Sequence, residues 1–421
     1  MRQPWYNLCL ENNLQEYCIF VTMSKANGVI GKQETYLHHV SLKNYKSIKD
    51  IDVKFKSGLN IIIGKNGSGK TNFVKSLNNI LNFKYSELPN STSKIEIKGN
   101  SKIVSLVRLS ILDESKKRLI DGFKLFINQQ KTETNEIYEI INQLRNTHSE
   151  YKSNLISHGI PYFNTEFLQI PGSMTITSYG AVSADMTKFG NSESVFIKQY
   201  FSSLFFDIVS KNIGVPPKAL DENFIHYKVS NSNHLFRFLN ATLKFYSPIS
   251  EVRINPDFRI ESNDFNNEIV LTNFSFQFKV LDAWQPFNFL SDGTKRLFYI
   301  ISEIAGLNFI HEPAVPDSTD FDIVFLEEPE LGIHPHQLHQ LMEFIKEQSN
   351  RKQIILTTHS PQVLDALGPD ELDRIIICHY EPKSGTQLSH LADNQIKKAQ
   401  KYMASEAFLS DYWRFSDLEP A

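Results

Sequence analysis

The chain has 421 residues, of which 41% are hydrophobic and 22% charged, and its formal net charge is −3. This length allows one large domain or two smaller ones with a substantial core, and the composition is ordinary for a soluble globular protein. The near-neutral charge gives no global case for binding nucleic acid or membranes, although a local basic groove stays possible. Its three cysteines lack metal-ligand spacing, which argues against disulfides and a zinc site and favours the cytoplasm.

The first residues hold only a short apolar run, residues 18–21, with acidic residues before it. That pattern is a poor secretory signal, and no apolar stretch approaches the length needed to span a bilayer. We therefore expect no membrane association. Met23 is an alternative translation start, and we assign residues 1–35 as an N-terminal extension.

The next segment predicts a strand, a glycine-rich loop and a helix in that order. Alternating apolar residues over residues 36–55 predict two strands that pair with each other. Residues 57–64, SGLNIIIG, are apolar without alternation, which is typical of a buried strand. From Phe73 to Ile80 apolar residues recur at helical spacing, which predicts a helix directly after the loop.

The loop itself, GKNGSGKT at residues 64–71, has the Gly-x-x-x-x-Gly-Lys-Thr pattern of a phosphate-binding loop. Its glycines let consecutive amides point at anionic oxygens, and the following helix adds the positive end of its dipole. Lys70 would serve the β- and γ-phosphates, and the Thr71 hydroxyl would bind Mg²⁺. A chance glycine-rich turn is disfavoured by the preceding strand and the complete ending. The predicted nucleotide-binding residues of the loop are Asn66, Gly67, Ser68, Gly69, Lys70 and Thr71.

Several short segments of strand-forming composition follow, at residues 94–97, 103–111 and 123–127. Apolar residues at three–four spacing over residues 132–156 predict one amphipathic helix. This helix either packs on its own domain or forms a short hairpin with residues 196–209. Residues 161–191 are rich in Gly, Ser and Thr and are predicted to be loop, and alternating strands return over residues 243–280.

A second acidic element, DIVFLEEPELGIHP, begins at Asp322. Residues 323–326 predict a buried strand that ends in Glu327 and Glu328. Carboxylates at the carboxyl end of a central strand lie where ligands bind in open α/β sheets. We predict that Glu327 holds Mg²⁺ through its water shell and that Glu328 polarises the water that attacks the γ-phosphate. The alternative, a strand that merely runs into an acidic turn, is disfavoured beside a complete phosphate loop.

Two further motifs each have a structural and a functional interpretation. In FLSDGTKRLF, Ser291 can act as the N-cap of a helix that continues past Leu297. The same pattern resembles the element with which one ATP-binding cassette subunit caps its partner's ATP, which implies that Ser291 and the Gly293 amide meet the γ-phosphate. His359 follows a predicted strand at residues 354–357. A lone histidine there is commonly structural, but it matches the switch histidine of ATP-binding cassettes.

Four elements in this order, GKNGSGKT, LSDGTKR, VFLEEPELGIHP and TTHSPQVLD, resemble the RecF/SMC/OLD-type branch of ATP-binding cassette ATPases. The resemblance covers roughly residues 36–83 and 287–419. It implies an α/β fold of the P-loop NTPase type, with a central mainly parallel sheet, an antiparallel β-subdomain and a helical insertion. It also implies a Mg²⁺-sensing glutamine, for which Gln129 and Gln130 are the candidates.

On this basis we divide the chain after the extension into three parts. Residues 36–130 form the N-terminal half of the ATPase with the phosphate loop and the β-subdomain. Residues 131–240 form a helical insertion, with a short coiled-coil-like hairpin and loops. Residues 241–421 form the C-terminal half, which contains the capping motif, the strand that ends at Glu327 and the switch histidine.

Departures from individual members of the branch narrow the expected function. The hundreds of heptad residues of an SMC protein are absent, and the roughly sixty residues after His359 lack the acidic pattern of the Toprim domain in OLD nucleases. The chain thus resembles an ATPase without its own nuclease, as in two bacterial anti-phage systems. These are Septu, whose partner is an HNH nuclease, and PARIS, whose partner is a Toprim nuclease; chain length and the short insertion favour Septu.

One phosphate loop and one capping motif per chain imply a head-to-tail homodimer, or a higher even-numbered homo-oligomer, that clasps ATP and Mg²⁺. Three functions stay open: a slow regulatory ATPase that gates a nuclease, a RecF-like DNA repair ATPase, and a nucleotide-sensing scaffold with little turnover. DNA is a further possible partner, because lysines cluster at Lys43, Lys46, Lys49, Lys54 and Lys56. We favour the alternative for this cluster, a solvated strand face with interleaved acids.

Overall fold

The computed structural model describes residues 35–81, 87–99, 103–113, 118–131, 151–156, 174–177, 182–183, 234–254, 259–263, 268–272, 276–310, 321–405 and 408–415. The extension at residues 1–34 and the predicted hairpin of residues 132–150 with 196–209 lie outside these ranges. Within the described part, no helix is both long and apolar enough to cross a membrane.

Five parallel strands form the centre of the main sheet. In spatial order they are β18 (Ile375–Glu381), β3 (Leu59–Ile63), β17 (Gln353–Thr358), β16 (Phe321–Glu327) and β8 (Tyr151–Ile156). Every side chain of β3 and β17 is buried. The two faces of β3 enter different cores, because Leu59 and Ile61 belong to one hydrophobic cluster and Ile62 to the other. Burial on both faces explains why this segment is apolar without alternation.

An antiparallel extension continues the sheet beyond β18. Its strands, in order, are β19 (Gly385–His390), β2 (Ile48–Lys54), β1 (Tyr36–Tyr45), β4 (Thr92–Lys98), β5 (Ile103–Asp113), β6 (Arg118–Ile127) and β7 (Gln130–Lys131). Strands β1 and β2 pair antiparallel, as the alternation over residues 36–55 predicted. The predicted strands after the phosphate loop are confirmed as β4, β5 and β6. The predicted α/β fold with a parallel centre and an antiparallel β-subdomain is therefore present.

Residues 151–156 correct the prediction of one helix over residues 132–156. They form β8, which pairs in parallel with β16 and places Leu155 opposite Phe325. The pairing satisfies backbone groups along one side of β16, and such tertiary hydrogen bonding overrides local helical spacing.

Two small sheets lie outside the main one. The first contains β10 (Val182–Ser183), β9 (Met174–Thr177), β13 (Glu268–Thr272) and β12 (Arg259–Asn263). The second contains β11 (Ile249–Ile254), β14 (Phe276–Val280) and β15 (Ala283–Pro286). The prediction of loop over residues 161–191 is thus wrong at β9 and β10, because β9 finds its partner, β13, far along the chain.

The predicted strands of residues 243–280 begin later than expected. Residues 243–246 form the end of helix α8 (His234–Tyr246), where Leu243 and Tyr246 turn one face into the core. This helix also contains residue 240, where we placed a boundary between two parts of the chain. The position of that boundary stays a prediction.

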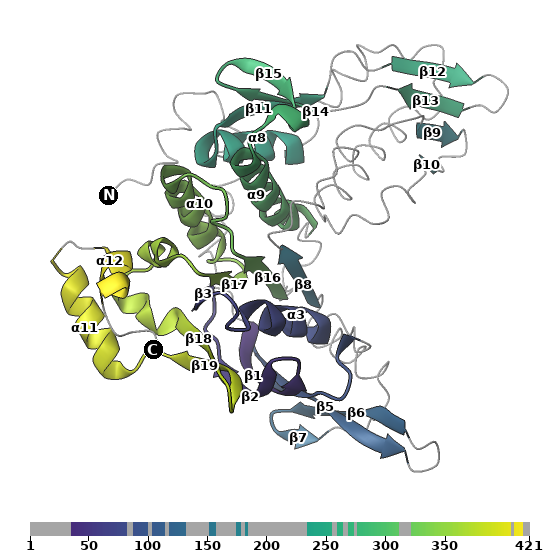
Figure 1. Cartoon of the computed structure of the whole chain (residues 1–421). Coiled ribbons are helices and arrows are strands. Elements are labelled where there is room, and N and C mark those ends of the chain that lie inside the picture. Colours follow the sequence, from purple (N-terminus) through teal and green to yellow (C-terminus); the bar gives the residue numbers. More distant parts are fainter. Residues whose placement is uncertain are drawn as a thin grey trace.

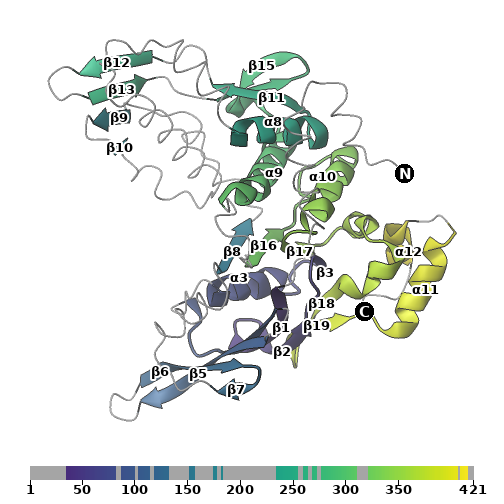
Figure 2. The ribbon, with the colours of Figure 1, turned by 180° about the vertical axis from the view of Figure 1, so that it is seen from behind.

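Helices cover the two faces of the parallel strands. On one face lies α3 (Lys70–Leu81), which buries Phe73, Val74, Leu77 and Ile80 as its helical spacing predicted. On the other lie α8, α9 (Asp292–Ile310) and α10 (Pro335–Gln348). Figures 1 and 2 show these three helices grouped together, while α11 (Asp393–Met403) and α12 (Leu409–Phe415) lie beside β18.

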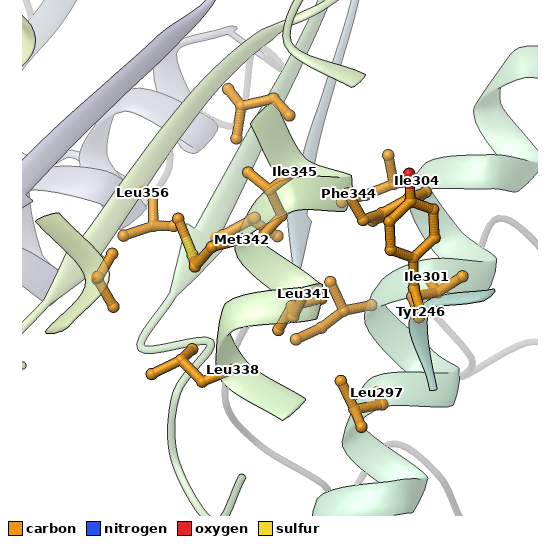
Figure 3. Close-up of a cluster of buried hydrophobic side chains, with 14 of the residues drawn as sticks. Tyr246, Leu297, Ile301, Ile304, Leu338, Leu341, Met342, Phe344, Ile345 and Leu356 are labelled. Atoms are coloured by element: carbon orange, nitrogen blue, oxygen red, sulfur yellow. The ribbon is translucent and has the colours of Figure 1, made fainter. Parts of the chain in front are cut away.

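The larger core is built between these helices and the sheet. In Figure 3, Leu341 and Phe344 of α10 lie toward Leu297 and Ile301 of α9, while Leu356 of β17 lies beside Met342. Each fully buried aliphatic or aromatic side chain of this kind contributes on the order of 1.5–3 kcal/mol to folding. This packing fixes α9 against the end of the sheet.

The buried side chain of Gln353 links β17 to the N-terminal strand β1. The Gln353 amide accepts a hydrogen bond from Leu37 N at 2.8 Å and donates to Leu37 O at 2.9 Å and Lys56 O at 3.0 Å. Leu37 and Gln353 are 316 residues apart. The N-terminal and C-terminal motifs are thus joined in one sheet, with their strand ends at one edge.

Candidate functional site

The phosphate loop runs between β3 and α3, as the order strand, loop and helix predicted. Gly69 has a φ of +104°, and a Cβ added there would lie 2.0 Å from Thr386 Oγ1. A side chain would be both strained and overlapping, so the position requires glycine. The sequence therefore makes the loop curve tightly against β19, with the start of α3 directed into it.

Lys70 lies inside the curve of the loop. The residue is 5% exposed, and its Nζ donates to Gly64 O at 2.6 Å and Lys65 O at 3.0 Å. Of the other predicted loop residues, Ser68 is buried and Thr71 is half-buried, while Asn66 and Gly67 are exposed. The ammonium group is thus placed next to the loop backbone that would surround a phosphate.

The hairpin of β18 and β19 packs against the phosphate loop. Sequence analysis did not indicate this contact. Cys378 Sγ donates to Ser68 O at 3.6 Å, and burial raises the pKa of this thiol, so it stays a protonated donor. The Ser47 hydroxyl accepts from Thr386 Oγ1 at 2.8 Å and from Asn72 Nδ2 at 2.9 Å. Because these residues lie in ordinary strand and turn patterns, no local signal distinguished them.

The predicted acidic pair lies at the same edge of the sheet. Glu327 is opposite Thr357 in β17, and Thr357 is opposite Ile62 in β3. The carboxyl end of β16 is therefore level with the start of the phosphate loop and two strand spacings, roughly 10 Å, away from it. Glu327 is 2% exposed, and both of its carboxylate oxygens are buried.

Glu328 marks a sharp change in chain direction. Its φ is +45°, in the left-handed region that non-glycine residues rarely adopt, and its N donates to Thr357 O at 2.8 Å. Strained backbone of this kind is concentrated at functional sites. The turn ends the strand with the Glu328 side chain half-buried, beside the end of β17.

His359 directly follows β17 and meets two carboxylates. Its Nδ1 lies 3.5 Å from Glu328 Oε1 and 3.6 Å from Glu330 Oε1. Glu330 also accepts hydrogen bonds from Thr358 Oγ1 at 2.5 Å and from His359 N at 3.3 Å. The sequence indicated Glu328 and His359 but not Glu330; the only signal was the third carboxylate of EEPE. The structure thus brings the predicted base and the predicted switch histidine together.

Ser291 is the N-cap of α9, as its position predicted. Its Oγ accepts a hydrogen bond from Thr294 N at 3.2 Å and lies 2.8 Å from Thr294 Oγ1. Gly293 is buried, and a Cβ added there would lie 2.4 Å from Gly332 O. Close backbone packing therefore requires Gly293 irrespective of any contact with nucleotide. The capping motif lies against the turn that follows β16 in the same chain.

Arg296, on the first turns of α9, links the capping motif to the acidic strand end. Its Nη2 donates to the backbone carbonyl of Glu327 at 3.2 Å and to that of Glu328. Burial lowers the pKa of Arg296, and the charges of Glu330 and Glu328 oppose that shift. An arginine stays protonated in proteins, so a buried cation balances the acids of this site.

The two glutamine candidates correct the prediction of a Mg²⁺-sensing residue. Gln129 lies in the turn between β6 and β7, and Gln130 is an exposed residue of β7. This strand ends the antiparallel extension, and Figure 1 shows it far from β16. Since the strand register that places Glu327 was not visible in sequence, spacing alone gave the wrong part of the sheet.

Most lysines of the proposed DNA-binding cluster have partners within the chain. Lys43 Nζ lies 2.7 Å from Asp50 Oδ2, Lys56 Nζ lies 2.9 Å from Asp373 Oδ2, and Lys49 Nζ donates to Lys383 O at 2.6 Å. These contacts favour the interpretation of a solvated strand face with interleaved acids.

The donors at the edge of the sheet suit Mg²⁺. Thr71 supplies a hydroxyl and Glu327 a carboxylate, both hard oxygen ligands of the kind Mg²⁺ prefers. Thr71 lies in the first turn of α3, which follows β3 and the phosphate loop, and Glu327 ends β16, with β17 between these two strands. In this arrangement most ligands of the ion would come from phosphate and water.

Two family models match the chain. One, described as "AAA domain", matches residues 39–172, and the other, described as "AAA domain, putative AbiEii toxin, Type IV TA system", matches residues 192–365. With the strand order and the phosphate loop, these matches support an AAA-type P-loop ATPase fold.

The chain is also similar to curated proteins. It is 43% identical over 42 residues to the DNA replication and repair protein RecF of Lactobacillus acidophilus, which covers 10% of this chain and 11% of that protein. It is 21% identical over 362 residues to an ATP/GTP phosphatase of Helicobacter pylori, covering 79% of this chain and 87% of that protein. The RecF similarity therefore concerns about a tenth of each protein.

Solved structures of SMC heads are similar in outline. An Smc head with an extended coiled coil, bound to the C-terminal domain of ScpA from Pyrococcus furiosus, has a TM-score of 0.49 and 16% identity, covering 88% of this chain and 99% of that chain. An SmcHead bound to the C-winged helix domain of ScpA has a TM-score of 0.47 and 14% identity, covering 86% and 99%.

Proposed function

We propose that this protein is an ATPase that dimerises around ATP and Mg²⁺ and regulates a separate nuclease in anti-phage defence. One observation carries the ATPase part: the sheet holds the phosphate loop, the Glu327–Glu328 strand end and His359 at one edge. The Helicobacter pylori relative named ATP/GTP phosphatase also supports nucleotide hydrolysis.

Each residue of the site has a defined task in this proposal. The loop amides and Lys70 bind the β- and γ-phosphates, and Thr71 with Glu327 would hold Mg²⁺, which neutralises phosphate charge when bound. Glu328 accepts a proton from the attacking water. His359, held beside Glu328, donates to the γ-phosphate. Nucleotide hydrolysis thus needs only positioned donors and one carboxylate base.

The capping motif supplies the reason for dimerisation. Ser291 is exposed at the start of α9, where a helix N-terminus presents backbone amides suited to an anion. In the proposed dimer this end meets the γ-phosphate held by the partner's phosphate loop. Loss of the γ-phosphate removes contacts from both chains and favours opening.

The variant Glu328→Gln tests this function. Removal of the base should slow ATP turnover by about 10²-fold or more, because general base catalysis supplies that order of rate. ATP binding should persist, so the variant should elute as a stable dimer with ATP and Mg²⁺ in size-exclusion chromatography with light scattering. Glu343→Gln, a change at an exposed glutamate of α10, is the control and should behave as wild type. A monomer unchanged by ATP would contradict the dimer.

The nuclease partner in this proposal comes from the resemblance to Septu and PARIS ATPase subunits. Co-expression with an HNH or Toprim nuclease encoded beside this gene would test it. We expect the two proteins to co-purify and DNA cleavage to depend on ATP and on Lys70. Cleavage that is equal with Lys70→Ala would show that this ATPase does not gate the nuclease.

A second candidate is a RecF-like DNA repair ATPase, which the 43% identity to RecF over 42 residues favours. Binding of DNA across a dimer would then require ATP and would weaken steeply as salt concentration rises, because phosphate contacts release counterions. Fluorescence anisotropy with labelled duplex DNA, with and without ATP, distinguishes the candidates. DNA binding without any partner protein favours repair, and its absence favours the defence role.

A further inference from the structure

Glu330 is a buried carboxylate at the end of the turn that follows Glu328. The residue is 8% exposed, and its Oε1 is the acceptor for Thr358 Oγ1 at 2.5 Å and for His359 N at 3.3 Å. Both donors belong to the end of β17, where the chain leaves the sheet. The carboxylate therefore fixes the backbone of His359 and the residue before it.

The same carboxylate also faces the imidazole ring. His359 Nδ1 lies 3.6 Å from Glu330 Oε1 and 3.5 Å from Glu328 Oε1. Two carboxylate oxygens beside Nδ1 hold that nitrogen on the protein side of the ring. The other ring nitrogen, Nε2, is then the one that can face a ligand. A carboxylate that orients a histidine without contacting the ligand itself is common where the histidine has a fixed task.

Burial of Glu330 is costly for stability alone. Its Oε2 is buried and has no hydrogen-bond partner among the residues that the structure describes. A buried carboxylate oxygen left unsatisfied destabilises a fold, and such groups are retained mostly where function needs them. Arg296 on α9 interacts with this carboxylate, because the charges of Glu330 and Glu328 oppose the lowering of the Arg296 pKa by burial.

We propose that Glu330 is a positioning residue for His359, which fixes the main chain and the ring so that Nε2 meets the γ-phosphate. This inference rests on the proposed ATPase function and adds a residue to it. Glu330 itself does not contact the nucleotide in this arrangement. Its loss should therefore impair only steps that depend on His359.

A double-mutant cycle on the full-length protein tests this dependence. Glu330→Ala should lower kcat for ATP about tenfold or more, and it should lower kcat no further in a His359→Ala background, because residues that act through one another are non-additive. Equal decreases in both backgrounds would overturn the proposal, as would an unchanged kcat in the wild-type background.

The preference for ATP over ADP distinguishes the proposed positioning role of Glu330 from a role in stability alone. Fluorescent ATP and ADP analogues should show that Glu330→Ala reduces affinity for the triphosphate and leaves that for the diphosphate unchanged, because only the γ-phosphate meets His359. Glu371→Ala is the matched control: Glu371 also accepts from a backbone amide and a side-chain donor, Gly368 N and Lys346 Nζ, but away from the nucleotide. It should lower thermal stability without changing this preference.

Glu330→Gln covers the case in which the alanine variant does not fold. Its amide oxygen keeps the acceptor for Thr358 and His359 N, while the charge beside Nδ1 is removed, so triphosphate preference should fall by less than with alanine. A glutamine variant equal to wild type in both preference and kcat contradicts the ring-orienting role. If the wild-type protein binds neither nucleotide, the proposed function fails, whereas normal wild-type binding with an unaffected Glu330 variant removes only this inference.

Discussion

At Gly69 and Gly67 the phosphate loop uses the same residue for different physical reasons. Gly69 combines a φ of +104° with an added Cβ 2.0 Å from Thr386 Oγ1, whereas Gly67 has a φ of +81° and nothing within 4 Å of an added Cβ. At Gly67 only the backbone angle requires glycine. Comparison of the two positions therefore distinguishes the cost of backbone strain from the cost of steric overlap.

We predict that Gly67→Ala lowers the free energy of unfolding by about 1 kcal/mol, the cost of a left-handed backbone with a Cβ. Gly69→Ala should cost about 1–3 kcal/mol more, because the methyl group overlaps the buried Thr386 side chain. Urea denaturation of both variants measures the difference. Thr386→Ala removes the two closest atoms and should recover part of the loss; equal costs for the two glycines would show that the overlap is absent.

At the scale of elements, α9 connects the capping motif to the acidic strand end. Arg296 donates to the carbonyls of Glu327 and Glu328, and Gly293 packs against Gly332. Because both contacts lie in the first turns of α9, a shift of this helix must move the end of β16. In the proposed dimer, contact of α9 with the partner's nucleotide would therefore affect the position of the residues that would carry out hydrolysis.

We expect Arg296→Met to lower the free energy of unfolding by about 3 kcal/mol, since it leaves buried acids without their cation. It should also slow ATP turnover, because Glu328 loses the contact that holds its backbone. Arg253→Met is the control: Arg253 stacks on Trp284 at 3.8 Å and should affect stability alone. Turnover reduced no more by Arg296→Met than by the control would contradict the connection.

At the scale of the whole molecule, the proposed pockets require two chains. Lys70→Ala and Ser291→Arg damage opposite halves of each pocket, so each variant alone should be inactive. In an equimolar mixture, half of the dimers pair one chain of each kind and contain one intact pocket, so about a quarter of wild-type activity should return. Full activity of Ser291→Arg alone, or no recovery from folded variants that exchange subunits, would contradict a shared pocket.

Much of this fold and site could be predicted from local sequence. The buried β3, the glycine loop, α3 and the strand that ends at Glu327 were all visible, because backbone preferences and side-chain periodicity act within a few residues. The role of Ser291 as the N-cap of its helix was visible for the same reason, since an N-cap bonds to the next turn of its own helix.

The tertiary structure decided what depends on contacts between distant segments. Residues 151–156 form a strand beside β16, and Gln129 and Gln130 lie away from the site. Cys378, Thr386 and Glu330 contact the site, although the sequence did not indicate them. Each of these rests on a pairing such as that of Leu37 with Gln353, 316 residues apart. Sequence spacing determines which way a side chain points along its own element, whereas the neighbour it meets depends on how the elements pack.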